Sequence, residues 1–215
     1  MNSFEPRFSE RAEELAAIGS DLYQRGWVPA TSGNFSMRLN EQTALVTASG
    51  KHKGRLGSDD FLAVDLQGQP RTAGKPSAET LLHTQLYAWQ PWIDTVLHCH
   101  SPTATVVSRL LPGNELVLAD YELLKAFRGV TTHATSLTLP VFENTQDIAA
   151  LADEVAAYLA QHPDCPAYLI RGHGVYCWGA SSAECMRQLE ALDFLLQCEL
   201  LTWQQPQRRP DGGDQ

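Results

Sequence analysis

Segments with the pattern of helices and segments with the pattern of strands alternate along this chain. Apolar residues recur at helical spacing from Ser9, the expected N-cap, to Tyr23, and Gly26 marks the expected end of this first helix. The β-rich runs "NFSMRL", "TALVT" and "FLAVDL" follow, separated by turns that contain glycine. This mixed order predicts an α/β domain built in layers.

The rest of the chain continues the same mixture. The segments "SAETLLHTQLYAW", "NTQDIAALADEVAAYLAQHP" and "SSAECMRQLEALDFLLQCELLTW" have helical period, and Ser181 and Glu184 have capping-box spacing at the start of the last one. The segment "IDTVLHCH" is β-rich, and "AYLIRGHGVYCWG" has the pattern of two strands around a turn. We therefore expect a single domain over residues 1–204, followed by a polar tail over residues 205–215.

Composition narrows the classes of partner and compartment. A net charge of −9 without a long basic run speaks against nucleic acid and favours small-molecule partners. No apolar run reaches the roughly 18 residues of a membrane span, and the N-terminus lacks the pattern of a signal peptide, so we expect a cytoplasmic protein without membrane contact. Five cysteines without a CxxC pair argue against disulfides and a cysteine zinc cluster, and predict buried thiols.

Two histidines stand one residue apart in "VLHCHSP". Alternate residues of a strand point to the same side, so His98 and His100 share one face and Cys99 points to the other. Catalytic zinc usually takes three protein ligands, and His173 is the best third candidate because it lies at the glycine-flanked turn "RGHG". Two ordinary strand histidines remain the alternative.

The other four histidines have settings typical of surface or packing residues. His52 lies in a basic loop, His83 in an expected helix, His133 in a threonine-rich stretch and His162 just past a helix.

Acidic residues and small turns supply the other candidate groups. Glu122 in "YELLKAF" and Glu79 after "KPSA" are candidates for the acid or base, although Glu79 also suits a helix start and Glu122 a solvated helix face. The turns "TSGN", "ASGK" and "KPSA" can present backbone N–H groups and hydroxyls to a phosphate, with Lys51 or Lys75 adding charge. None has the spacing of a P-loop, and each alone is more often only a turn.

Taken together and in this order, "TSGNFS", "TASGK", "KPSAE", "HCHSP" and "RGHGVYCWG" resemble the class II aldolase/adducin family over nearly the whole chain. The segments "YELLKA" and "PVFENT" bring the chain nearer to the branch of the family that dehydrates 5-methylthioribulose 1-phosphate in methionine salvage. The resemblance implies a three-layer α/β/α fold around a mostly antiparallel sheet. It also implies one zinc ion per subunit and a homo-oligomer, commonly a tetramer, with active sites near subunit boundaries.

The resemblance further implies roles for individual residues. It places zinc on His98, His100 and His173, and it gives Glu122 the role of general acid/base. It places the substrate phosphate near five residues: Gly33, Asn34, Ser49, Gly50 and Ser77. Glu79 matches the catalytic carboxylate of the aldolases in the family's "PSSE" motif, whereas Ala78 departs from that motif's second serine.

The implied reaction converts 5-methylthioribulose 1-phosphate to 2,3-diketo-5-methylthiopentyl 1-phosphate. Zinc would bind the C2 carbonyl and the C3 hydroxyl, a base would remove the C3 proton, and the C4 hydroxyl would then leave. Glu122 can serve both steps if burial raises its pKa enough for it to carry a proton. The first alternative is a class II sugar-phosphate aldolase or epimerase, similar to fuculose-phosphate aldolase, that uses Glu79. The second is a non-catalytic, adducin-like scaffold, against which the set of histidines argues.

Overall fold

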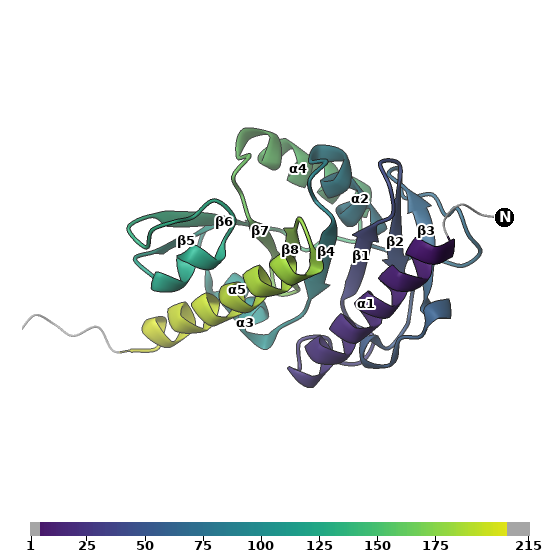
Figure 1. Ribbon diagram of the computed structural model, residues 1–215. Coiled ribbons are helices and arrows are strands. Elements are labelled where there is room, and N and C mark those ends of the chain that lie inside the picture. Colours follow the sequence, from purple (N-terminus) through teal and green to yellow (C-terminus); the bar gives the residue numbers. More distant parts are fainter. Residues whose placement is uncertain (1–4, 206–215) are drawn as a thin grey trace, which may run out of the picture.

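The computed structural model describes residues 5–205, and its centre is one eight-stranded sheet in the order β3-β2-β1-β4-β8-β7-β6-β5 (Figure 1). The strands are β1 (Asn34–Arg38), β2 (Thr43–Thr47), β3 (Phe61–Asp65), β4 (Thr95–Cys99), β5 (Glu115–Ala119), β6 (Ser136–Phe142), β7 (Ala167–Ile170) and β8 (Gly174–Gly179). Only β6 and β7 pair in parallel; the other six pairs are antiparallel. The expected mostly antiparallel sheet is confirmed.

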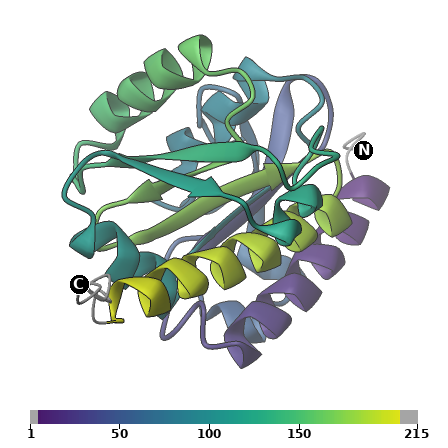
Figure 2. The same ribbon diagram turned by 90° about the vertical axis from the view of Figure 1, so that its left-hand side faces the viewer.

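Helices cover both faces of the sheet and complete three layers (Figures 1 and 2). The helices are α1 (Glu5–Gln24), α2 (Thr80–Trp89), α3 (Pro102–Leu110), α4 (Ile148–Gln161) and α5 (Ser182–Trp203), with three 3-10 turns η1 (Lys53–Arg55), η2 (Ser58–Asp60) and η3 (Glu122–Ala126). One hydrophobic core joins α1, α3 and α5 to the sheet, and a second core joins α2 and α4 to the opposite face. Neighbouring β4 residues divide between them, since Leu97 packs in the first core and Val96 in the second.

Two helix starts were predicted from the sequence, and the first of them is wrong. Helix α1 already begins at Glu5, so Ser9 lies inside it and is not the N-cap. The apolar period starts only after Ser9, which is why the more polar first turn could not be recognised from the pattern. At α5 the N-cap is Ser181 as expected, because its hydroxyl accepts a hydrogen bond from the Glu184 N–H at 3.2 Å. The second half of the capping box does not form, since the Glu184 carboxylate accepts from the Ala180 N–H and not from that of Ser181.

The remaining expectations concern the cysteines, the tail and the membrane. All five cysteines are free thiols; four are buried, and Cys198 is partly exposed. Within residues 5–205, no helix has the length and apolar character needed to cross a membrane. From residue 206 onward, the expected polar tail lies outside the described residues.

Candidate active site

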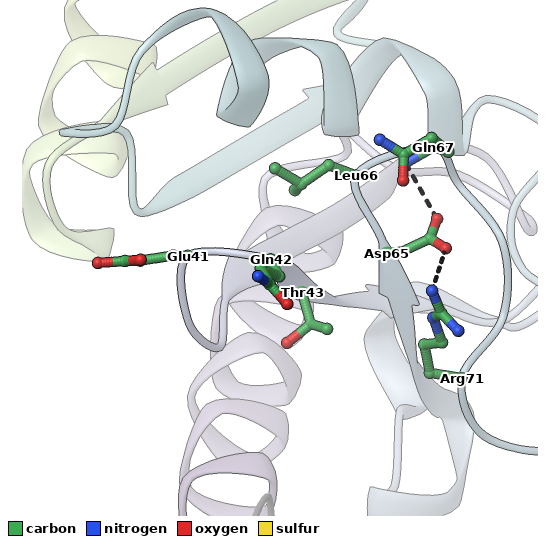
Figure 3. A pocket seen from close by; sticks show the side chains of 7 residues that line it. All are labelled: Glu41, Gln42, Thr43, Asp65, Leu66, Gln67 and Arg71. Atoms are coloured by element: carbon green, nitrogen blue, oxygen red, sulfur yellow. Dashed lines mark hydrogen bonds and ion pairs between the residues drawn. The ribbon is translucent and has the colours of Figure 1, made fainter.

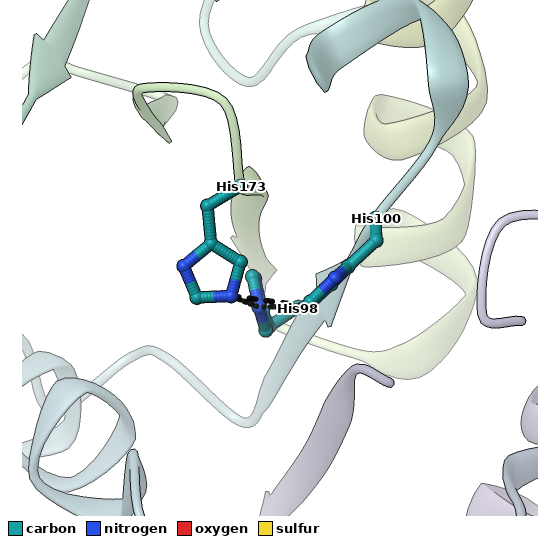
Figure 4. A group of neighbouring side chains, drawn as sticks. All are labelled: His98, His100 and His173. Atoms are coloured by element: carbon teal, nitrogen blue, oxygen red, sulfur yellow. Dashed lines mark hydrogen bonds between the residues drawn. The ribbon is translucent and has the colours of Figure 1, made fainter. Parts of the chain in front are cut away.

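Three imidazoles converge at one end of the sheet (Figure 4). His98 lies in β4, His100 just after it, and His173 in the turn between β7 and β8. The Nε2 atom of His98 lies 2.9 Å from that of His100 and 3.3 Å from that of His173, and the last two Nε2 atoms are 3.1 Å apart. Nitrogen ligands at ~2.0–2.1 Å in a tetrahedral zinc site lie about 3.3 Å from one another. The three donors therefore fit a single metal ion.

The turn that carries His173 has little conformational freedom. A Cβ atom at Gly174 would overlap the carbonyl oxygen of Cys99, so only glycine lets β8 begin this close to β4. The Arg171 guanidinium donates hydrogen bonds to the carbonyl oxygens of Ser108, Leu111 and Gly113 and so ties the turn to the last turn of α3 and the segment after it. These contacts hold His173 against His98 and His100.

The protonation state of the imidazoles suits metal binding. The Nδ1–H of His98 donates to the Val175 carbonyl oxygen at 3.0 Å, which leaves a lone pair on the Nε2 atom that faces the other histidines. Burial, reinforced by the two neighbouring imidazoles, lowers the pKa of His98 well below its usual value. Burial also lowers the pKa of His100 to about 4. Both rings are therefore neutral at pH 7, as a metal ligand must be.

Glu79 lies in the histidine cluster of its own chain. Its Oε1 atom is 3.4 Å from His173 Nε2, and its Oε2 atom is 3.4 Å from His98 Nε2. The Oε2 atom also accepts hydrogen bonds from Asn34 Nδ2 at 2.7 Å and from the Tyr176 hydroxyl at 3.0 Å. Glu79 occupies the N-cap position of α2 but makes no side-chain capping bond to the described backbone. Its carboxylate therefore serves the cluster rather than the helix end.

A cavity of about 350 Å³ opens beside the histidines. Glu79, His100 and His173 line it, together with the five residues predicted to bind phosphate: Gly33, Asn34, Ser49, Gly50 and Ser77. Gly33 has φ 73°, and a Cβ atom there would lie 2.7 Å from the His98 carbonyl oxygen, so this position requires glycine. The fold thus brings the three predicted turns and two of the three predicted metal ligands to one cavity, with the buried His98 in contact with both of those ligands.

Lys53 is a residue of this cavity that the sequence did not single out. Its side chain is 2% exposed, and its Nζ atom donates to the carbonyl oxygens of Thr31 at 3.0 Å and Lys51 at 2.7 Å. Among the described residues that line the cavity, Lys53 is the one lysine or arginine. Lys51, which the sequence suggested as a source of charge, instead pairs with Asp60 at 2.7 Å. Burial lowers the pKa of Lys53 to about 8.

Glu122 is not brought to the histidines within one chain. It follows β5, whose last residue Ala119 pairs with Ser136 at the start of β6, whereas the histidine cluster lies where β4, β6 and β7 end. The Glu122 side chain is 73% exposed and contacts Lys125 and His133. The hydrogen bond from Lys125 lowers the pKa of Glu122. Burial was expected to raise this pKa, but in the single chain the side chain is exposed.

The other histidines remain outside the metal cluster, but one of them is connected to it. His52 packs edge-on against Tyr23, and His162 stacks on Tyr158. His83 is fully buried and hydrogen-bonds to Asn34, which contacts Glu79. The helical pattern around His83 gave no signal for this connection, because it depends on β1.

A larger cavity, of about 670 Å³, lies beside the outer strands β2 and β3 (Figure 3). Its lining includes an ion pair between Asp65 and Arg71 at 2.9 Å, but none of its seven lining residues is a histidine or cysteine. The smaller cavity beside the histidines is therefore the candidate active site.

Comparisons with known proteins agree with this location. The family described as "Class II Aldolase and Adducin N-terminal domain" matches residues 13–200. A methylthioribulose-1-phosphate dehydratase of Pseudomonas aeruginosa is 60% identical over 87% of this chain and 92% of its own length. The protein of the same name from Azotobacter vinelandii is 55% identical over 91% of this chain and 95% of its own. The structure of L-fuculose-1-phosphate aldolase from Thermus thermophilus covers 91% of this chain and 98% of its own, with 27% identity and a TM-score of 0.72.

Proposed function

Because the chain belongs to the class II aldolase and adducin family, we propose that it dehydrates 5-methylthioribulose 1-phosphate to 2,3-diketo-5-methylthiopentyl 1-phosphate, a step of methionine salvage. The observation that carries the proposal is the convergence of three histidine Nε2 atoms beside Glu79 and the predicted phosphate-binding turns. Relatives that share 55–60% of their residues with this chain bear the name of that dehydratase.

The proposed cofactor is one zinc ion per subunit, held by His98, His100 and His173. Three imidazole nitrogens form a usual donor set of catalytic zinc, whose remaining coordination position is taken by water or substrate. When bound there, zinc would polarise the ketone of the substrate and stabilise negative charge that develops on its oxygen. A non-catalytic scaffold would not need three histidine Nε2 lone pairs directed at one point.

The phosphate of the substrate would lie against the three turns on the cavity wall. Gly33 and Gly50 let backbone N–H groups approach an anion closely, while Ser49 and Ser77 offer hydroxyl donors. Lys53 would supply the positive charge, because Lys51 pairs with Asp60 and neither Lys51 nor Lys75 is among the residues that line the cavity. Asn34 has less to offer, because its side chain already contacts Glu79 and His83, so only its second amide hydrogen remains for the phosphate.

Glu79 is the proposed base that takes the proton from carbon 3 of the substrate. Two donors, Asn34 Nδ2 and the Tyr176 hydroxyl, hold its carboxylate beside His98 and His173. These two hydrogen bonds fix the orientation of the carboxylate that is proposed to accept the proton.

Glu122 is the proposed acid for the leaving hydroxyl, and it acts in a neighbouring subunit. Its position at the opposite end of the sheet excludes contact with the histidines of its own chain. A homotetramer with sites near subunit boundaries, as the family resemblance implies, would place Glu122 of one chain at the cavity of the next. Burial there would raise its pKa toward the value that an acid catalyst needs.

These roles balance the reaction. Glu79 accepts the C3 proton, the bond between carbon 4 and its hydroxyl breaks, and Glu122 protonates the departing oxygen to give water. The resulting enol loses its hydroxyl proton, and carbon 4 takes up a proton from solvent, which yields the 2,3-diketone.

The test is to incubate the purified, zinc-loaded protein with 5-methylthioribulose 1-phosphate in deuterated water and to follow the products by mass spectrometry. The proposal predicts the diketone with its carbon skeleton intact and with solvent deuterium at carbon 4. Dihydroxyacetone phosphate and a two-carbon thioether aldehyde would instead identify the aldolase alternative, in which Glu79 assists cleavage of a carbon–carbon bond.

A further inference from the structure

A chain of hydrogen bonds connects the hydrophobic core to Glu79. The Tyr87 hydroxyl lies 2.7 Å from Ser36 Oγ, and Ser36 Oγ lies 2.7 Å from His83 Nδ1. His83 Nε2 contacts Asn34 Oδ1, and Asn34 Nδ2 lies 2.7 Å from Glu79 Oε2. Tyr87 and His83 stand one turn apart on α2, whereas Ser36 and Asn34 alternate on β1, so two elements supply the chain.

Every bond in this chain has only one reasonable direction. As a carboxylate, Glu79 can only accept, so Asn34 must present its amide N–H to Glu79 and its carbonyl oxygen to His83. His83 therefore carries its proton on Nε2, and its Nδ1 atom accepts from the Ser36 hydroxyl. The Ser36 oxygen in turn accepts from the Tyr87 hydroxyl. All four donors point toward Glu79.

The surroundings of His83 favour the neutral ring that this chain requires. The residue is 1% exposed, and burial lowers its pKa to about 4, so it is uncharged at pH 7. A neutral imidazole offers one donor and one acceptor, which match the Asn34 carbonyl oxygen on one side and the Ser36 hydroxyl on the other. The Tyr176 ring packs edge-on against the imidazole, with ring centres 5.4 Å apart, and limits its rotation.

We infer that His83 is a positioning residue of the active site: as the Nε2–H tautomer, it fixes the amide of Asn34 so that this amide orients the Glu79 carboxylate between His98 and His173. The effect on turnover rests on the proposed function, in which Glu79 removes the C3 proton. Without His83, the Asn34 amide can rotate and turn its carbonyl oxygen toward Glu79, which would repel the carboxylate. A shift of the base by about 1 Å is enough to slow a reaction roughly 100-fold.

The kinetic test compares His83→Leu with His83→Gln, whose amide N–H can reach the Asn34 oxygen. The matched control is Thr84→Val on the same helix, since the buried Thr84 hydroxyl has no hydrogen-bond partner within residues 5–205. We expect His83→Leu to keep full zinc content and a KM within about threefold, while kcat falls about 10- to 100-fold. His83→Gln should recover most of kcat, and Thr84→Val should match the wild type. A folded, zinc-loaded His83→Leu enzyme with unchanged kcat would overturn the inference, as would equal losses in the Leu and Gln variants.

A second measurement does not depend on activity or on folding of a His83 variant. A long-range proton–nitrogen spectrum of the wild-type protein with isotope-labelled histidine reports which ring nitrogen of His83 carries hydrogen. The inference predicts the Nε2–H form in the wild type. It predicts a mixture of tautomers in Ser36→Ala, where Nδ1 loses the hydroxyl that donates a hydrogen bond to it. The Nδ1–H form in the wild type would contradict it. If the wild type failed to dehydrate the substrate, the proposed function would be wrong, whereas this spectrum would still decide the state of His83.

Discussion

Glu79 Oε1 lies 3.4 Å from His173 Nε2, although the two residues come from opposite halves of the chain. The contact forms because β4 pairs with β8 and because α2 begins over the same end of the sheet. It places a carboxylate of the same chain beside the proposed metal position. The consequences can be measured through metal content, proton exchange, subunit mixing and pH dependence.

Removal of one histidine should remove the metal. We expect the metal-replete wild type to carry one zinc per chain, and His98→Ala to carry almost none, because two imidazoles do not replace the three-ligand set. Elemental analysis of the purified proteins measures this, and circular dichroism verifies that the fold is retained. His162→Ala serves as the control and should keep its zinc, because His162 caps α4 just before β7 begins, whereas the cluster lies at the end of the sheet where β7 ends. Equal zinc in both variants would exclude the histidine cluster as the metal site.

Substitution of Glu79 and substitution of Glu122 should each block a different proton transfer. Both Glu79→Gln and Glu122→Gln should lower kcat by roughly 100- to 10,000-fold, the range typical of losing a general acid or base. In deuterated water, Glu122→Gln should still exchange the C3 hydrogen of the substrate for deuterium, because Glu79 remains to remove it. Glu79→Gln should lose this exchange. Mass spectrometry of recovered substrate distinguishes them, and exchange lost only in Glu122→Gln would reverse the assignment.

Two inactive variants should restore activity to each other if Glu122 acts across a subunit boundary. In a mixed oligomer, a Glu122→Gln chain supplies intact histidines, and a neighbouring His98→Ala chain supplies an intact Glu122. Co-expression with different affinity tags and purification through both tags isolates such oligomers. We expect their turnover to exceed that of either parent by far. Activity no higher than that of the parents would mean that Glu122 acts in its own chain or not at all.

Substrate binding should weaken as pH rises through the pKa of Lys53. Burial lowers this pKa to about 8, while the nearby charges of Asp60 and Glu79 act in the opposite direction. Lys53 is therefore charged below about pH 8 and neutral above it, so KM should rise between about pH 7 and about pH 9. Lys53→Met should raise KM about 10- to 100-fold, the value of a charge-assisted hydrogen bond, and should flatten the profile in this range. A KM of Lys53→Met equal to that of the wild type would remove Lys53 from the phosphate site.

Local patterns were sufficient to predict the parts of the site that follow directly from strand geometry. Alternation along β4 placed His98 and His100 on one face, and the glycines around His173 marked a turn between two strands. The three candidate phosphate turns were visible as well, because glycine and serine identify a turn wherever it lies in the fold. Each of these predictions needs only a few neighbouring residues.

The residues that the sequence left undecided depend on contacts between distant elements. Glu79 had an adequate explanation at a helix start, and only the packing of α2 over β1 reveals its contact with the cluster. Lys53 resembles the other lysines of its loop until folding buries it against Thr31. For Glu122 the motif predicted a catalytic role, but within its own chain the residue lies at the opposite end of the sheet from the histidines. Whether it reaches an active site therefore depends on contacts that a local motif does not describe.

The pairing of β4 with β8 also couples metal binding to the stability of the fold. His98 and His173 meet only after residues far apart in the chain have paired, so the complete ligand set does not exist in the unfolded protein. An ion that binds only the native state adds about 2.7 kcal/mol to the free energy of unfolding when its concentration is 100 times its Kd. The same ion would bridge β4 and the turn before β8. Chelation would therefore lower the melting temperature as well as the activity, and zinc supply would govern how long the protein survives in its folded form.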